Sequence, residues 1–186
     1  MRQRVTEGTI APEFTFDTPD ERGLGFHAAI AGRMAVVYFL RYMGCPICQS
    51  KMAELRHDAR TFAEKGARTF VVLQSDPDIV RQAMEGEAWP FTVICDPEQA
   101  IFALWGVAPG NLLHYLAPSV LLAAFRASRA GFRHGVKEGN ELQRPAVFII
   151  DRAATVAVAH YGRTIADVPD GAVIAARLKH VRKAGR

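Results

Sequence analysis

Short runs of apolar residues, separated by segments with helical patterns, organise the chain from residue 34 onward. Residues 34–40 are almost continuously apolar and rich in β-branched and aromatic side chains, which is typical of a strand buried on both faces of a sheet. Residues 69–73 and 91–95 have the same character. A segment with helix signals follows each run, so the pattern predicts alternating strands and helices.

The helix signals consist of apolar spacing and capping residues. After Cys48 the apolar residues recur in steps of four, three, four and three up to Phe62, which is the spacing of one helix face, and Gly66 supplies a stop signal. After the second strand, Asp76 is suited to cap a helix and Pro77 to occupy an early helical position. We therefore predict one helix after each of these two strands.

The sequence Asp96-Pro97-Glu98-Gln99 predicts the start of a third helix, which should end near Gly106, because it combines a cap, a proline and a capping-box-like glutamine. Two further strands are expected over residues 147–150 and 155–159, joined by a link of hairpin length. A helix over residues 172–183 closes the chain. This order predicts an α/β protein with a central mixed β-sheet, parallel in part, and helices on both faces.

The length and composition are those of one ordinary globular domain. A chain of 186 residues can bury a core of its own, and 49% hydrophobic with 23% charged residues is far from the composition of disordered proteins. We expect a single domain over residues 1–186, with a helical insertion at about residues 107–144, before the last hairpin.

An amphipathic helix is expected within this insertion. Its apolar face would contain Leu116, Val120, Ala123 and Ala127. Another face would carry Arg126, Arg129 and Arg133. These arginines form either a solvated face or a docking patch for an acidic partner or an anionic substrate.

The charge distribution favours neither nucleic-acid binding nor membrane insertion. The net charge is +4, and basic residues gather near the C-terminus without interleaved aromatic side chains, at Arg177, Lys179, Arg182, Lys183 and Arg186. We interpret them as a solvated helix end and expect no nucleic-acid partner. The most apolar stretch, residues 112–125, is interrupted by His114 and Pro118 and is shorter than the about 20 residues of a membrane helix.

The N-terminus shows no secretory signal, because the basic residues 1–4 are followed by polar Thr6, Glu7 and Gly8 and not by an apolar core. We therefore expect a cytoplasmic protein. Three cysteines, an odd number, then argue against a structural disulfide framework and indicate redox chemistry or metal binding.

The sequence Cys45-Pro46-Ile47-Cys48 is the candidate for redox chemistry. It lies at the predicted start of a helix, where unpaired N–H groups and the helix dipole favour a thiolate. Cys48, one turn further on, is close enough to attack a sulfur-linked intermediate on Cys45 and to close a disulfide. We therefore assign Cys45 as the nucleophile and Cys48 as the resolving cysteine.

Two other interpretations of the pair are half of a zinc site and two inert core thiols. Zinc needs about four ligands, and the sequence offers no second Cys-X-X-Cys and no close histidine pair, so we expect neither a metal nor an organic cofactor. Cys95 ends a predicted buried strand without a cationic neighbour in sequence, which indicates a core thiol. The alternative role for Cys95 is that of a second resolving cysteine.

Three segments, residues 8–16, 39–48 and 145–151, resemble the thioredoxin superfamily and, within it, the peroxiredoxin-like branch of the alkyl hydroperoxide reductase and thiol-specific antioxidant (AhpC/TSA) family. The resemblance spans most of the chain and implies a thioredoxin-like fold. It also implies a thiol-disulfide oxidoreductase or antioxidant protein that reduces disulfides or small hydroperoxides. A dithiol of the thioredoxin or glutaredoxin type would be its reductant, and a homodimer is allowed.

The resemblance also bears on Pro145 and on two tyrosines. Similarity to thioredoxin-fold proteins implies that Pro145 is in the cis form and packs against the cysteine pair, whereas the alternative is a trans proline at the first position of a strand. Typical peroxiredoxins carry a proline seven residues and a threonine or serine three residues before the reactive cysteine, where this chain has Tyr38 and Tyr42. The family's arginine is also replaced, by Pro145.

Arg41 and Tyr42 are candidates to replace these groups, because a nearby guanidinium favours a thiolate and a phenol can donate a hydrogen bond. The alternative for Arg41 is a strand-end side chain that points to solvent. Two functions follow from the sequence. One is a thiol-dependent oxidoreductase whose peroxidase activity is left open, and the other is a redox-sensing or scaffold protein with negligible turnover.

Overall fold

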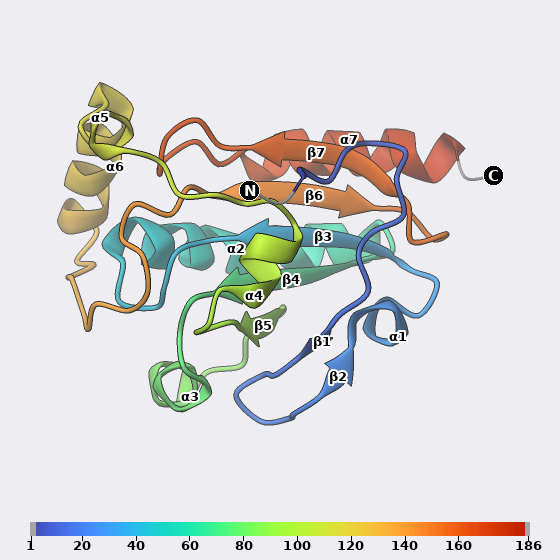
Figure 1. Ribbon diagram of the computed structural model, residues 1–186, viewed down its shortest axis with the longest axis horizontal. Helices are drawn as coiled ribbons and strands as arrows, with labels where there is room; N and C mark the ends of the chain where they lie inside the picture. Colours follow the sequence, from blue (N-terminus) through green and yellow to red (C-terminus); the bar gives the residue numbers. More distant parts are fainter. Residues whose placement is uncertain (1–2, 185–186) are drawn as a thin grey trace.

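The computed structural model describes residues 3–184 (Figure 1). The ends of the two basic segments considered above, at Arg2 and Arg186, lie outside the described residues.

A five-stranded mixed sheet forms the centre of the molecule, as predicted. Its strands are β3 (Met34–Phe39), β4 (Ala67–Leu73), β5 (Thr92–Cys95), β6 (Ala146–Ile150) and β7 (Val156–Tyr161). They lie in the order β5-β4-β3-β6-β7, in which β3, β4 and β5 are parallel and β6 is antiparallel to both of its neighbours.

The central strand β3 explains why the apolar runs are continuous. Val37 of β3 lies opposite Phe70 of β4 and Phe148 of β6. Alternate residues of β3 enter two separate cores, so Val36 and Val37 pack on opposite faces of the sheet. Every residue of β3 and β6 is buried, because both faces of the sheet are covered.

Helices α2 (Pro46–Glu64) and α7 (Gly171–Ala184) cover one face of the sheet and lie behind it in Figure 1. The apolar residues that α2 buries in this core are Cys48, Met52, Leu55, Ala59 and Phe62. This is the predicted helix face, and α7 adds Ile174 and Leu178 to the same core. Helix α3 (Pro77–Met84) begins after its cap Asp76, as predicted, and contributes Val80.

The other face is covered by α1 (Phe26–Ile30) and α4 (Ala100–Leu104), which lie in front of the sheet in Figure 1. A two-stranded antiparallel ribbon of β1 (Thr15–Phe16) and β2 (Leu24–Gly25) lies beside α1. Trp105 is fully buried in this second core. The hydrophobic pattern did not reveal the ribbon, since strands of two residues are too short to show a period.

The predicted start of α4 at Asp96 is wrong by about one turn. The Asp96 carboxylate accepts hydrogen bonds from the backbone N–H groups of Ala100, Ile101 and Phe102, each at 2.9 Å. Asp96 therefore caps the helix although it lies four residues before Ala100, the first helical residue. The residues between Asp96 and Ala100 form a turn, which ends at Gln99 in the left-handed region. The aspartate is the capping group, but the proline does not open the helix.

Helices α5 (Leu112–Tyr115) and α6 (Pro118–Arg129) occupy the insertion, and α6 packs against α2. Val120 and Ala127 of the predicted apolar face are buried, whereas Leu116 precedes the helix and is 57% exposed. Arg133 likewise lies beyond the helix end. The predicted helix face was too long, because Pro118 starts a new helix and Gly131 follows its end.

The predicted cis bond before Pro145 is wrong, since every peptide bond between described residues is trans. Gln143 already forms an isolated β-bridge with Pro109, and the Pro145 carbonyl accepts a hydrogen bond from Gly162 N at 2.9 Å. The chain thus enters β6 in an extended conformation that continues its pairing with β7, and it makes no reversal that a cis bond would serve.

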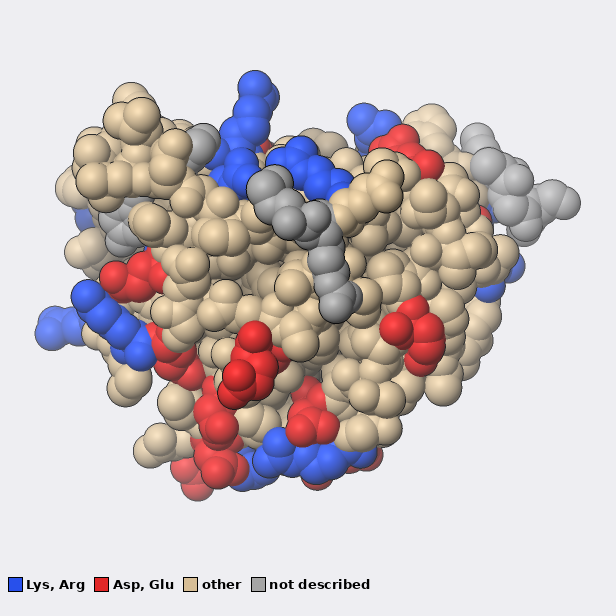
Figure 2. Space-filling model, in the orientation of Figure 1, with Lys and Arg blue, Asp and Glu red and all other residues tan. Residues whose placement is uncertain are grey.

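Two surface properties bear on the expected partners. On the face drawn in Figure 2, acidic side chains gather in the lower part, with Lys and Arg side chains around them. Among the described residues, none of the helices combines the length and the apolar character needed to cross a bilayer.

Candidate active site

The cysteine pair follows β3 and lies at the end of the sheet where the parallel strands have their C-termini. Cys45 is the N-cap of α2 and Pro46 occupies its first turn. The backbone N–H of Cys48 points at the Cys45 sulfur, with an N–Sγ distance of 3.3 Å. The predicted position of Cys45 at a helix N-terminus is therefore confirmed, and its sulfur serves as the capping acceptor.

Both thiols are free and buried, and Cys45 is 0% exposed. The pKa of Cys45 is lowered to about 6. The largest cause is the hydrogen bond from the Cys48 side chain. Burial acts in the opposite direction, and the charge and hydrogen bond of Arg41 lower the pKa further. Burial, with the hydrogen bond to Cys45, raises the pKa of Cys48 well above its ordinary value. At neutral pH the site thus holds a Cys45 thiolate beside a Cys48 thiol.

Arg41 is the cationic partner of the thiolate. Its side chain is only 4% exposed, and its Nη2 donates to Cys45 Sγ at 2.9 Å. Its Nη1 donates to the main-chain carbonyl of Glu141. Burial disfavours the charged guanidinium, but the negative charge of Cys45 and the hydrogen bond to it favour the charged form, and the pKa of Arg41 is raised. The alternative of a solvent-facing Arg41 is therefore wrong, and the arginine forms a buried ion pair with the thiolate.

Tyr42 is fully buried beside Arg41, but its hydroxyl has a different partner from the one expected. The hydroxyl donates to Glu141 Oε1 at 3.0 Å and lies 3.1 Å from Nε2 of His134. Burial, followed by the hydrogen bond to Glu141, raises the pKa of Tyr42. Tyr42 therefore contacts the segment that covers the site, and its phenol proton is directed to a carboxylate and not to Cys45.

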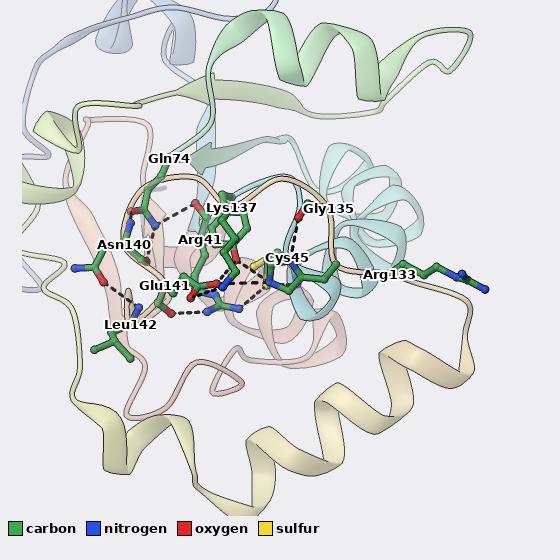
Figure 3. Close-up of polar contacts among 12 residues, drawn as sticks. Arg41, Cys45, Gln74, Arg133, Gly135, Lys137, Asn140, Glu141 and Leu142 are labelled. Atoms are coloured by element: carbon green, nitrogen blue, oxygen red, sulfur yellow. Dashed lines mark hydrogen bonds and ion pairs between the residues drawn. The ribbon is translucent and has the colours of Figure 1, made fainter.

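That covering segment comprises residues 133–143, between α6 and β6, and we call it the strap (Figure 3). Its Gly135 N–H donates to the carbonyl of Gly44 at 2.8 Å, and Gln49 Nε2 lies 3.3 Å from the carbonyl of Arg133. A Cβ atom on Gly44 would meet the carbonyl oxygen of Val136 at 2.3 Å. The strap is thus in direct contact with the residue before the nucleophile.

Further along the strap, Glu138 is tied to the loop that follows β4. The Ser75 hydroxyl donates to Glu138 Oε2 at 2.9 Å and accepts from Met43 N at 2.8 Å, while Asp76 N donates to Glu138 Oε1 at 3.2 Å. Sequence reasoning missed this role of the strap. Its partners are about 60 to 100 residues away in the chain, and no local motif marks the pairing.

The remaining candidate residues are Cys95 and Pro145. Cys95 is a buried thiol at the end of β5, and burial raises its pKa to about 12. Pro145 is buried at the start of β6, where its ring and carbonyl face Gly162. Within residues 3–184, no group of three or more His, Cys, Asp or Glu side chains is arranged to hold a metal ion.

Comparison with solved structures shows the same fold in thiol-dependent proteins. Peroxidoxin BcpB from Mycobacterium tuberculosis matches with a TM-score of 0.68 and 14% identity, over 97% of this chain and 98% of that one. A peroxiredoxin-like protein from Aquifex aeolicus matches with a TM-score of 0.68 and 17% identity, over 97% and 90%. A Chlorobium tepidum protein assigned as thiol:disulfide interchange protein DsbE matches with a TM-score of 0.63 and 16% identity, over 95% and 98%.

A search of curated proteins gives no match. A family model does match: the model of the AhpC/TSA family covers residues 8–159, which include β3, the cysteine pair and the strap. Together with the thioredoxin-like arrangement of the sheet, this match confirms the resemblance seen in the sequence. The chain therefore belongs to the AhpC/TSA family.

Proposed function

We propose that this protein is a thiol-disulfide oxidoreductase of the peroxiredoxin-like kind, with Cys45 as the nucleophile and Cys48 as the resolving thiol. One observation carries the proposal: Arg41 Nη2 lies 2.9 Å from the sulfur of Cys45, which caps the helix that carries Cys48. Family membership supports a thiol-dependent oxidoreductase in general. The contacts of Cys45 supply the thiolate that such an enzyme needs at neutral pH.

The first step is an attack by the Cys45 thiolate. With a disulfide substrate, the thiolate bonds to one sulfur and the other sulfur leaves as a thiolate that takes a proton from water. With a hydroperoxide, the thiolate bonds to the terminal oxygen and the O–O bond breaks, so that Cys45 becomes a sulfenic acid. The other oxygen leaves as an alkoxide or hydroxide and takes a proton from water to give an alcohol or water. In both cases the sulfur of Cys45 supplies the electron pair of the new bond.

The second step uses Cys48. Its sulfur attacks Cys45 Sγ and expels either the bound substrate thiol or, from the sulfenic acid, a hydroxide that leaves as water with the Cys48 proton. The product is a Cys45–Cys48 disulfide. An external dithiol of the thioredoxin or glutaredoxin type then returns both thiols to the reduced form.

Arg41 takes the thiolate-stabilising role in this proposal, and Tyr42 acts through Glu141 of the strap. Pro145 is assigned no step in it, since the bond before it is trans; that Pro145 packs against the cysteine pair stays a prediction. A cytoplasmic location and a possible homodimer stay predictions.

Stopped-flow oxidation tests the proposal. The reduced protein is mixed with hydrogen peroxide or with a small disulfide, and wild type is compared with Cys48→Ser. Wild type should form an intramolecular Cys45–Cys48 disulfide, whereas Cys48→Ser should stop at a Cys45 sulfenic acid or mixed disulfide, which peptide mapping identifies. A product that is chiefly Cys45–Cys95, or an intermolecular bridge, would show that Cys48 is not the resolving cysteine.

A second candidate function is redox sensing with negligible turnover. It is favoured by the complete burial of Cys45 next to the strap, since oxidation that displaced the strap would change the surface that residues 133–143 form. Repeated turnover with a thioredoxin-type reductant distinguishes the two functions, because a sensor would be oxidised once and an enzyme would consume many equivalents of substrate.

A further inference from the structure

Gln74 joins the main chain of Arg41 to the strap. It follows β4 directly, is 1% exposed, and its backbone N–H donates to the carbonyl of Arg41 at 2.8 Å. Its side-chain Nε2 lies 3.3 Å from the same carbonyl and 3.4 Å from the carbonyl of Asn140. Its Oε1 accepts the backbone N–H of Asn140 at 2.7 Å. One buried amide thus uses both its donor and its acceptor atoms between two segments.

The strap also contacts the guanidinium of Arg41, one residue beyond its contact with Gln74. Glu141 follows Asn140 directly, and its carbonyl accepts from Nη1 of Arg41 while Nη2 of the same group donates to Cys45. Figure 3 shows these contacts as one group, with Gln74 and Asn140 on one side of Arg41 and Cys45 on the other. Gln74 therefore fixes the backbone of Arg41 directly and the direction of its guanidinium through the strap.

The strap also packs directly against the amide. Gly139 has a φ of +57°, which favours glycine, and a Cβ atom at this position would meet Gln74 Oε1 at 2.5 Å. A hydrocarbon side chain of similar length at position 74 would leave the N–H and the carbonyl of Asn140 without their partner. The site is therefore built for a carboxamide.

We propose that Gln74 is a positioning residue that holds Arg41 against Cys45 by fixing Asn140 and Glu141 of the strap. The inference rests on the proposed function, because it concerns the reactivity of the same nucleophile. Gln74 is not a catalytic residue, since its contacts are with Arg41 and Asn140 and not with a reacting atom.

Several charged or titratable groups surround Cys45, and they define what Gln74 can control. The loop after β3 contributes Arg41 and Tyr42, and α2 contributes Cys48. The strap contributes Glu141, whose carboxylate is 3.5 Å from Lys137 Nζ and 3.6 Å from His134 Nε2. Arg41 is the cation that touches the sulfur, so a displaced guanidinium should raise the pKa of Cys45 by about one unit, within the range known for such pairs.

The test measures the alkylation rate of Cys45 by iodoacetamide against pH in the full chain, with each thiol quantified by peptide mapping. Gln74→Met, which keeps the side-chain volume, should raise the midpoint by about one unit and slow alkylation about tenfold at pH values below the midpoint. Gly139→Ala, which disturbs the same contact from the strap, should raise the Cys45 midpoint by a similar amount. It replaces Gln74→Met in the test if Gln74→Met does not fold.

Gln49→Ala is the matched control. Gln49 also ties the strap, but its side-chain amide donates to the carbonyls of Met43 and Arg133 and not to Arg41 or Asn140. Gln49→Ala should therefore leave the midpoint of Cys45 unchanged. Equal shifts in Gln49→Ala and Gln74→Met would overturn the proposal, because they would reflect general loosening of the strap.

Arg41→Met separates failure of this inference from failure of the proposed function. If Arg41→Met raises the midpoint while Gln74→Met and Gly139→Ala lower only the melting temperature, Gln74 has a merely structural role and the inference is wrong. If Arg41→Met also leaves the midpoint unchanged, the proposed role of Arg41 fails as well. A shift in Arg41→Met, Gln74→Met and Gly139→Ala, with none in Gln49→Ala, supports the inference.

Discussion

Cys45 and Cys95 are two buried thiols near the same edge of the sheet, and their surroundings give them opposite acidities. Cys45 follows β3 and Cys95 ends β5, which is parallel to it through β4. The pKa of Cys45 is lowered to about 6, whereas burial raises the pKa of Cys95 to about 12. Burial is common to both sites and disfavours the thiolate in both, so it cannot explain the difference.

The difference lies in the hydrogen bonds and charges around each sulfur. At Cys45, the hydrogen bond from the Cys48 side chain lowers the pKa most, and the guanidinium of Arg41 and the backbone N–H of Cys48 lower it further. At Cys95, burial is the main cause of the raised pKa, the charge of Arg22 opposes it, and the charges of Asp76, Asp17 and Glu138 add to it. Direct hydrogen bonds to the sulfur and an adjacent cation therefore distinguish the acidic thiol from the core thiol.

The largest effect that tests this comparison comes from exchanging each thiol for a hydroxyl. Cys45→Ser should abolish reduction of disulfides and hydroperoxides, because serine supplies no thiolate. Cys95→Ser should leave the rate near that of wild type, since Cys95 is protonated and acts as a core residue. Turnover assays of the two variants measure this. A large loss of activity in Cys95→Ser would contradict the core role and support Cys95 as a second resolving cysteine.

A smaller effect is expected when Gly135 and Val136 of the strap are displaced from Gly44 while Asn140 and Glu141 keep their contacts with Gln74 and Arg41. The methyl group of Gly44→Ala would collide with the Val136 carbonyl and push the strap away. Each hydrogen bond lost from the strap is worth about 1 kcal/mol, so the open form should become about fivefold more populated per bond.

The reaction of Gly44→Ala with a bulky aromatic disulfide should then be faster than that of wild type by a similar factor. The reaction with hydrogen peroxide, which is small, should change less and provides the internal control. Equal acceleration of both reactions would contradict the interpretation of the strap as a cover.

The smallest effect concerns the cap beside Cys95. Asp96→Ala removes the acceptor of three backbone N–H groups and should lower the free energy of unfolding by about 1–2 kcal/mol, or the melting temperature by about 2–8 °C. Alkylation of Cys45 should be unchanged. Asp96→Asn keeps an oxygen acceptor and should lose less stability, so equal losses in the two variants would argue against a capping role.

The fold is largely predictable from sequence because its central elements carry strong local patterns. The continuous apolar runs of β3, β4 and β6 and the periodic face of α2 are visible in the amino-acid sequence alone. The start of α4 is not, since the Asp96 side chain caps a turn that begins four residues later. The sequence identifies the capping residue but not how far its carboxylate reaches.

The site is predictable only as far as it is local. Cys45 and Cys48 are identified by their spacing, whereas the burial of Arg41 depends on the strap, which lies 100 residues away in the chain at Glu141. The same holds for Gln74, whose contacts with Asn140 span 66 residues. Strand alternation could not decide the orientation of Arg41, because it follows the end of β3 in a loop.

A site-resolved titration of the thiols tests the central claim most directly. In the reduced wild-type protein, the iodoacetamide alkylation rate of each cysteine is followed from pH 4 to pH 10 by peptide mapping. Because the thiolate is the reactive form, the rate at Cys45 should rise through a midpoint at about 6 and level off near neutral pH, while Cys95 stays unreactive throughout. A Cys45 midpoint near 9, the ordinary value of a thiol, or earlier alkylation of Cys95, would contradict this account.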